Sequence, residues 1–176
     1  MLGEKTKKNL AEAFAGESMA RNKYDYFASV ARKAGYVQIA NIFEESALNE
    51  KEHAKLWAKQ LELISEDTLK NLIEAVKGET YEHTEMYPRM AEEATAEGHH
   101  EIAMLFRNVA KAEQAHAARY QKLQENIEKG EVFKKTEVKR WKCDNCGYIH
   151  EGTEAPEKCP SCQHPQAHFE VFVETY

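Results

Sequence analysis

The chain has 176 residues, with 24 Lys and Arg against 30 Asp and Glu, and a formal net charge of -6. This length suits one ordinary domain and a small one. No apolar run is long enough to span a membrane, and no secretory signal opens the chain. Acids and bases are interspersed, which disfavours nucleic acid or an anionic membrane as a partner.

Residues 4–129 have the composition of helices, because they are rich in Ala, Glu, Lys, Leu and Gln and contain only Pro88 as a breaker. The expected helices cover about residues 5–33, 37–64, 78–96 and 100–128. Glycines are expected to end the first, third and fourth of them, at Gly35, Gly98 and Gly130.

The segment between the second and third expected helices is polar at its start. Ser65, followed by Glu66 and Asp67, is expected to be an N-cap with acidic residues in the first turn. The short stretch 66–76 is then expected to cross to the far side of a helical bundle.

The helical region is an internal duplication of a helix pair. A lone Glu is followed, 33 or 34 residues later, by the motif Glu-x-x-His, and this arrangement occurs twice. The two copies are Glu17 with Glu50 and His53, and Glu79 with Glu113 and His116. Phe43 and Trp57 in the first copy match Phe106 and Tyr120 in the second. The second copy is one residue longer.

These acids and histidines share helix faces, because residues three apart on a helix point the same way. Buried together, the carboxylates would cost several kcal/mol each to desolvate, an objection that two divalent ions remove. Such ligation suits iron or manganese and leaves zinc open. The expected inward set is Glu17, Glu50, His53, Glu79, Glu82, Glu113 and His116.

Three further residues are candidates for a catalytic role. Glu82 has no counterpart in the first copy, so it is either a surface residue or a carboxylate that binds one ion in one oxidation state. Tyr24 lies two turns after Glu17 and could contact a ligand carboxylate, supply a proton or simply pack in the core. If the inserted residue forms a π-bulge after Glu79, Tyr87 takes the matching place in the second copy.

The four cysteines form two C-x-x-C pairs, Cys143 with Cys146 and Cys159 with Cys162. In a chain without an export signal, such pairs indicate a metal site rather than disulfides. They can place four thiolates tetrahedrally around one ion. Iron there would make a one-electron carrier, whereas zinc would make a structural ribbon.

The C-terminal segment 141–176 is too short to bury enough apolar surface by itself, so a metal staple is expected. Trp141, Tyr148 and Phe169 are expected to form its small core. The charged segment 131–140 is expected to be a linker that leads into a strand.

Taken together, the motifs resemble the rubrerythrin family over nearly the whole chain. The matching segments are Phe14-Ala-Gly-Glu17-Ser, Asn49-Glu50-Lys-Glu-His53-Ala, Gly78-Glu79-Thr-Tyr-Glu82 with Met86-Tyr87-Pro88, Glu113-Gln-Ala-His116-Ala, and the C-terminal C-x-x-C-G-Y and C-P-x-C. The resemblance implies a mainly α fold. It consists of a ferritin-like di-iron four-helix bundle at 1–130, joined by the linker to a rubredoxin-like domain with one iron at 141–176.

The resemblance also implies roles for single residues. Glu17 and Glu79 would be terminal iron ligands, Glu50 and Glu113 bridges, and His53 and His116 caps. Glu82 would exchange with His53 as the iron changes oxidation state, and Tyr24 and Tyr87 would lie next to the ligands. One departure is Gln163, which follows the last cysteine where the family usually has glycine. A turn with positive φ there would cost about 1 kcal/mol.

The function that the resemblance implies is reduction of hydrogen peroxide to water in the cytoplasm. Electrons would come from a rubredoxin or an NAD(P)H-dependent reductase through the four-cysteine iron. A helix of 28 residues is about 42 Å long, so a module at its end is far from its own di-iron pair. A head-to-tail homodimer or larger oligomer is therefore expected. The alternatives are a ferroxidase that handles iron and a non-catalytic zinc protein.

Overall fold

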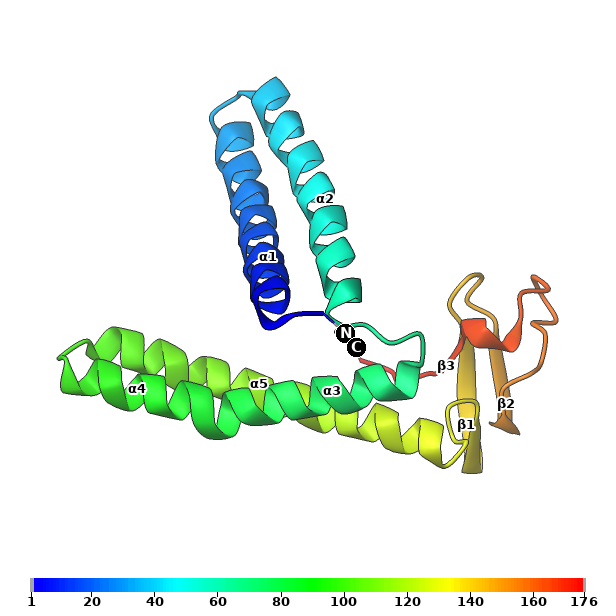
Figure 1. Ribbon diagram of the computed structural model, residues 1–176. Helices are drawn as coiled ribbons and strands as arrows, with labels where there is room; N and C mark the ends of the chain where they lie inside the picture. Colours follow the sequence, from blue (N-terminus) through cyan, green and yellow to red (C-terminus); the bar gives the residue numbers. More distant parts are fainter. Residues whose placement is uncertain (1, 176) are drawn as a thin grey trace. The chain divides into compact units, whose positions relative to one another are not determined.

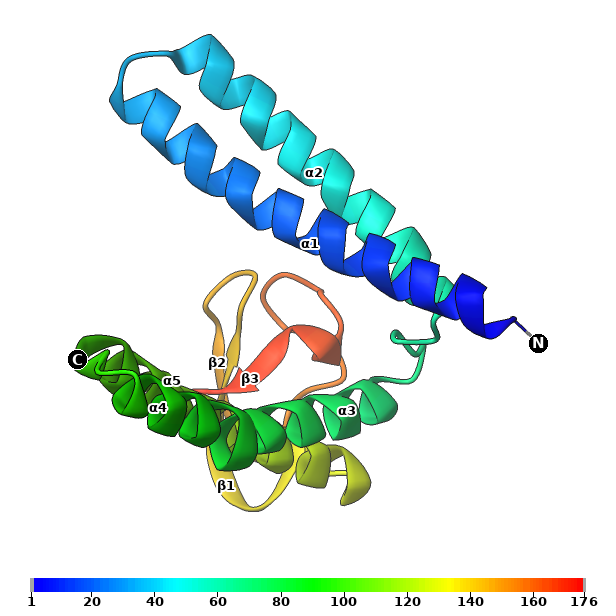
Figure 2. The ribbon, with the colours of Figure 1, turned by 60° about the vertical axis from the view of Figure 1, so that its left-hand side comes forward.

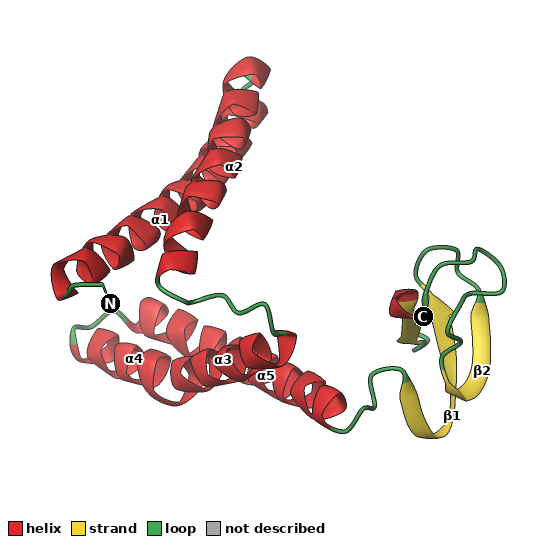
Figure 3. Cartoon of the chain, turned by 45° about the vertical axis from the view of Figure 1, so that its right-hand side comes forward, coloured by secondary structure: helices red, strands yellow, loops and turns green. Residues whose placement is uncertain are grey.

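The computed structural model describes residues 2–175, which belong to two compact units, Met1–Glu66 and Asp67–Tyr176. The first unit is an antiparallel hairpin of helices α1 (Glu4–Lys33) and α2 (Val37–Gln60) (Figures 1 and 2). The second contains the remaining helices and all the strands (Figure 3). Its helices are α3 (Thr68–Tyr81), a π-helix (Glu82–Met86), α4 (Tyr87–Ala96) and α5 (His100–Glu128). Within residues 2–175, no helix combines the length and apolar character needed to cross a bilayer.

Alanines line the contacts between paired helices in both units. In the first hairpin the buried residues of α1 and α2 are all alanines, including Ala28 and Ala54. In the second unit Ala91 of α4 and Ala103 of α5 are buried in the same way. Small side chains allow two helices to approach closely. Some larger apolar residues, such as Ile42 at 55% exposure, remain exposed, whereas Phe43 packs against the alanines of the first hairpin.

The second helix ends earlier than predicted, at Gln60 rather than near residue 64. Glu62 adopts the left-handed conformation, with φ 58°, and the Leu63 N–H donates to the Ala58 carbonyl. This is the same Schellman pattern that Gly35 and Gly98 make at the ends of α1 and α4. The prediction missed this end because the sequence has Glu where a glycine would mark it.

The third helix begins ten residues earlier than predicted, at Thr68. Its N-cap is Asp67, whose side chain accepts a hydrogen bond from the Leu69 N–H at 2.9 Å, so the expectation that Ser65 caps the helix was wrong. The stretch 66–76 is therefore mostly helix, and the connection between the two hairpins is confined to the residues between Gln60 and Thr68.

The predicted π-bulge is confirmed. Residues Glu82–Met86 form a π-helix, and the Tyr87 N–H donates to the Glu82 carbonyl. The inserted residue widens the turn directly before Pro88, which has no N–H to donate and would clash with a regular α-helical turn. Beyond this point the second copy of the repeat regains the register of the first.

The C-terminal region forms a three-stranded antiparallel sheet in the order β2-β1-β3. Its strands are β1 (Lys134–Cys143), β2 (Ile149–Glu154) and β3 (Phe169–Val171). Strand β1 begins inside the segment expected as a linker. Trp141 and Phe169 are buried in the core as predicted, together with Cys143 and Cys159, but Tyr148 is 36% exposed, so its predicted place in the core was wrong.

Candidate metal centres

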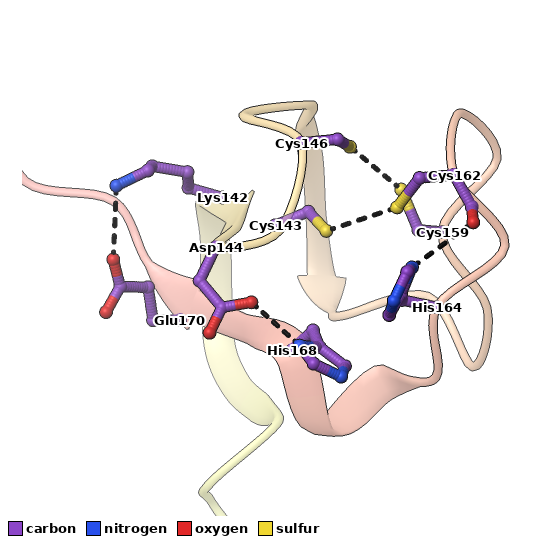
Figure 4. Close-up of polar contacts among 9 residues, drawn as sticks. All are labelled: Lys142, Cys143, Asp144, Cys146, Cys159, Cys162, His164, His168 and Glu170. Carbon is purple, nitrogen blue, oxygen red and sulfur yellow. Dashed lines mark hydrogen bonds and ion pairs between the residues drawn. The ribbon is translucent and has the colours of Figure 1, made fainter.

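The four cysteines come together at one end of the sheet, where the loop after β1 and the segment before β3 face each other (Figure 4). Their sulfur atoms all lie within 4.8 Å of one another. Cys143 Sγ is 3.7 Å from Cys162 Sγ, and Cys146 Sγ is 3.7 Å from Cys159 Sγ. Sulfurs bound tetrahedrally at about 2.3 Å from one ion lie about 3.8 Å apart. The group therefore fits a four-thiolate metal.

The thiols of this group differ in acidity. The backbone N–H of His164 donates to Cys162 and is the main reason that its pKa falls to about 5. For Cys146 the Tyr148 amide acts in the same direction, but the neighbouring thiols and desolvation outweigh it and raise the pKa to about 11. The cysteine group therefore already holds a thiolate at neutral pH, which is the form that binds metal.

Gln163 occupies the turn position that favours glycine, with φ 63°. The corresponding residue after the first cysteine pair is Gly147, with φ 78°.

We expect Gln163→Gly to raise the free energy of unfolding of the C-terminal region by about 0.5–1 kcal/mol. The glycine relieves the left-handed strain, and this gain is partly offset because it adds chain entropy to the unfolded state. Denaturant unfolding of the iron-loaded chain, followed by visible absorbance, measures this. Gly147→Ala is the matched control and should lower stability. Equal stability of Gln163→Gly and the parent would contradict the prediction.

In the first hairpin, Glu17 of α1 approaches Glu50 and His53 of α2. His53 Nδ1 lies 2.8 Å from Glu50 Oε2 and 3.8 Å from Glu17 Oε1. The donor atoms of all three residues lie within 4.8 Å of one another. Their side chains remain partly exposed, with Glu50 at 20% and His53 at 52%.

The second unit repeats this arrangement between α3 and α5. His116 Nδ1 lies 2.7 Å from Glu113 Oε2 and 3.6 Å from Glu79 Oε2, and the three donor sets again lie within 4.8 Å. Two carboxylates and an imidazole this close suit an iron ion. The duplication seen in the sequence is thus a duplication of site geometry, and the two groups are suited to a di-iron centre.

The two candidate tyrosines occupy equivalent places. Tyr24 packs on Phe43 with ring centroids 6.0 Å apart and planes at 34°, and Tyr87 packs on Phe106 with the same separation and angle. Burial raises the pKa of Tyr87, and the carboxylates of Glu82, Glu113 and Glu79 raise it further. Glu82, half-buried at the start of the π-helix, is therefore within electrostatic reach of Tyr87.

The pKa values of the Glu17 and Glu79 carboxyl groups are raised above the usual value of a glutamate. A hydrogen bond shared with Glu50 raises the pKa of Glu17, with burial adding to it, and burial followed by a hydrogen bond with Glu113 raises the pKa of Glu79. The folded metal-free chain therefore binds more protons than the unfolded chain at pH values above the usual 4.5 of glutamate. These carboxyls thus lower the stability of the metal-free protein as pH rises through their folded pKa values.

We accordingly expect Glu17→Gln to raise the Tm of the metal-free protein at neutral pH and to reduce the fall in Tm between about pH 4 and 7. The effect is small, because water screens these partly exposed groups. Thermal unfolding in the presence of a chelator, followed by circular dichroism, measures it. Glu12→Gln, at an exposed position of the same helix, is the control. Parallel pH profiles for the two variants would refute the expectation.

Some residues near the sites were not predicted. His164 and His168 stack edge to face beside the cysteines, and His168 Nδ1 lies 2.9 Å from Asp144 Oδ1 (Figure 4). The spacing of these two histidines in the sequence did not indicate that they lie beside the cysteines. Trp57 approaches Glu17. The sequence feature that could have indicated this is the match between Trp57 and Tyr120 in the two copies of the repeat. His83 Nδ1 lies 2.7 Å from the Glu79 carbonyl one helical turn earlier.

The chain is similar to known proteins over almost its whole length. Residues 8–124 match the family model Rubrerythrin, and residues 141–170 match the model Rubrerythrin, rubredoxin-like domain. A rubrerythrin of Clostridium perfringens is 54% identical, over 99% of this chain and 97% of its own length. A rubrerythrin of Nitratidesulfovibrio vulgaris is 48% identical, over 96% and 95% respectively.

A solved structure of nigerythrin is 35% identical and covers 98% of this chain and 88% of its own, with a TM-score of 0.36. The family matches confirm the predicted fold class, which is mainly α and ferritin-like with a small rubredoxin-like C-terminal domain. They also agree with the metal groups described above, one of four cysteines and two of carboxylates with histidine. The chain therefore belongs to the rubrerythrin family.

Proposed function

We propose that this chain is a non-haem di-iron peroxidase that reduces hydrogen peroxide to water. The observation that carries the proposal is the presence on one chain of two matched carboxylate–histidine groups and a separate four-sulfur group. The two carboxylate–histidine groups suit a reaction that needs two electrons at once. The four-sulfur group suits one-electron transfer that reduces those sites again. Similarity to rubrerythrins, a family of oxidoreductases, supports the same reading.

In this proposal each carboxylate–histidine group holds one iron, and Glu82 is a seventh ligand. Bound iron would supply the two electrons that cleave the O–O bond, according to H₂O₂ + 2e⁻ + 2H⁺ → 2H₂O. The ligand roles are those of the family resemblance. By that resemblance, Glu17, Glu50 and His53, together with Glu79, Glu113 and His116, would hold the iron, and Glu82 would bind in exchange for His53.

The chain's own residues would supply the protons. Tyr87 is held in its protonated form, because burial and three nearby carboxylates raise the pKa of its phenol. As a protonated phenol it can donate a hydrogen bond in this site, and we propose that it relays protons together with Glu82. Tyr24 has the same aromatic neighbour geometry in the first copy, and we assign it the same role.

Electrons would enter through the four-cysteine iron. Cys146 is exposed and Cys162 partly exposed, whereas Cys143 and Cys159 are buried, so a donor can approach only one side of the group. We propose a rubredoxin or an NAD(P)H-dependent reductase as that donor. Four cysteines that bind a metal rather than form disulfides agree with a cytoplasmic location, which we propose.

The length of α5 supports a homodimer or larger homo-oligomer. His116 precedes the last residue of α5, Glu128, by about 18 Å of helix. Because the sheet follows that end of the helix, we propose that the chains associate head to tail, so that the cysteine module of one serves the di-iron pair of another. Full turnover by a particle shown to be monomeric during the assay would contradict this.

The decisive test is anaerobic reduction of the iron-loaded protein followed by 1.5 equivalents of hydrogen peroxide per chain, which matches the three electrons held by three ferrous ions. We expect the absorption bands of both iron centres to return, with two electrons consumed per peroxide. Reoxidation accompanied by accumulation of a ferric mineral would indicate a ferroxidase instead. A colourless protein that contains only zinc as isolated from its native source would indicate a structural role.

A further inference from the structure

The indole N–H of Trp57 is a buried donor without an acceptor. Among residues 2–175, Trp57 Nε1 is the only fully buried side-chain nitrogen or oxygen that has no hydrogen-bond partner. Leaving such a donor unpaired destabilises the fold, because the group has lost its hydrogen bond to water. The other tryptophan shows the usual solution, because Trp141 Nε1 donates to the Gly152 carbonyl at 3.0 Å. The unpaired indole therefore needs an explanation.

Its position points to the first carboxylate–histidine group. Trp57 lies four residues after His53 and seven after Glu50 on α2, so the three side chains share one helix face. The indole also acts on Glu17 across the hairpin. The Trp57 side chain is within hydrogen-bonding reach of the Glu17 carboxylate on the facing helix. The indole thus lies beside Glu17 but does not complete a hydrogen bond with it.

The second copy of the repeat provides an internal comparison. Tyr120 occupies the place of Trp57, four residues after His116, and its ring also ends in a donor. However, Tyr120 presents a phenol O–H where Trp57 presents an indole N–H. The two copies therefore share their ligands but differ in what lies behind the terminal carboxylate.

We propose that Trp57 is a positioning residue whose indole N–H holds the oxygen of Glu17 that does not face the metal. This proposal rests on the iron-binding function proposed above. A partner behind a ligand fixes its orientation and typically changes metal affinity 10–100-fold. Trp57 would satisfy its buried donor when Glu17 turns to bind iron. The first iron site would then be the more rigidly organised of the two.

The test is anaerobic calorimetric titration of the full-length protein with Fe²⁺, after the four-cysteine site has been filled. We expect Trp57→Phe to weaken Fe²⁺ binding at one of the two carboxylate–histidine sites by about 10-fold or more. We expect Tyr120→Phe to change binding at the other site by less. A second variant carries benzothienylalanine at position 57, which keeps the indole shape but replaces N–H with sulfur. It should weaken binding as Trp57→Phe does.

The isostere separates the hydrogen bond from packing. Native affinity in the benzothienylalanine variant would overturn the proposal, even if Trp57→Phe binds weakly, because only the N–H has been removed. If Tyr120→Phe weakened Fe²⁺ binding as much as Trp57→Phe does, the proposed difference between the two iron sites would be overturned. The indole ¹⁵N–¹H resonance of Trp57 provides a readout without metal. It should move upfield in Glu17→Ala, whereas the Trp141 resonance should not. These measurements do not depend on peroxide turnover, so they can succeed even if the peroxidase proposal fails.

Discussion

Replacing Cys159 with serine is expected to unfold the C-terminal module and abolish its visible absorption. Cys159 is fully buried, and it belongs both to the four-sulfur group and to the small core around Trp141. A structural metal held by four ligands typically contributes about 10–16 kcal/mol to the folding of a domain this small. The apolar core alone is too small to replace that contribution.

Near-ultraviolet circular dichroism of Trp141 and the visible spectrum of the iron-loaded chain measure the change. The helices should keep their far-ultraviolet signal, because they lie outside the module. Ser161→Ala is the matched control, since Ser161 is exposed and lies between Cys159 and Cys162. A Cys159→Ser protein with a native Trp141 signal and no bound metal would contradict this prediction, because it would show that the module folds without its metal ion.

Replacing Glu113 with glutamine is expected to lower peroxide reduction at least 100-fold, or about 2.7 kcal/mol in the activation barrier. Glu113 Oε2 lies 2.7 Å from His116 Nδ1, and its side chain is only 15% exposed. The amide keeps the shape but removes the negative charge that Glu113 would contribute to the proposed iron site. Replacing even a residue behind a metal ligand commonly costs 10–100-fold, so losing a ligand charge should cost at least as much.

Steady-state peroxide consumption and iron content per chain measure this loss. Glu101→Gln is the control, because Glu101 is exposed in the first turn of the same helix. Visible absorption of the four-cysteine iron should be unchanged in both variants, which separates loss of the di-iron site from loss of the electron carrier. Unchanged activity and iron content in Glu113→Gln would remove Glu113 from the ligand set.

The sequence determined the features that depend on local spacing. Helix periodicity and the glycines at 35, 98 and 130 were enough to place α1 and α5 and three of the helix ends. The repeated Glu-x-x-His motif located both carboxylate–histidine groups, because residues three apart on a helix must share a face. The one-residue insertion predicted the π-helix before Tyr87. The two C-x-x-C pairs likewise predicted one cluster of four sulfurs.

The tertiary structure decided what depends on contacts between distant residues. The left-handed Glu62 ends α2 without a glycine, and Asp67 rather than Ser65 caps α3. Tyr148 lies outside the core, which is formed by Trp141, Phe169 and two buried cysteines among others. The unpaired Trp57 N–H depends on how α1 packs against α2. Spacing along one helix fixes which side chains share a face, but only packing between helices decides which of them approach one another and which lose contact with water.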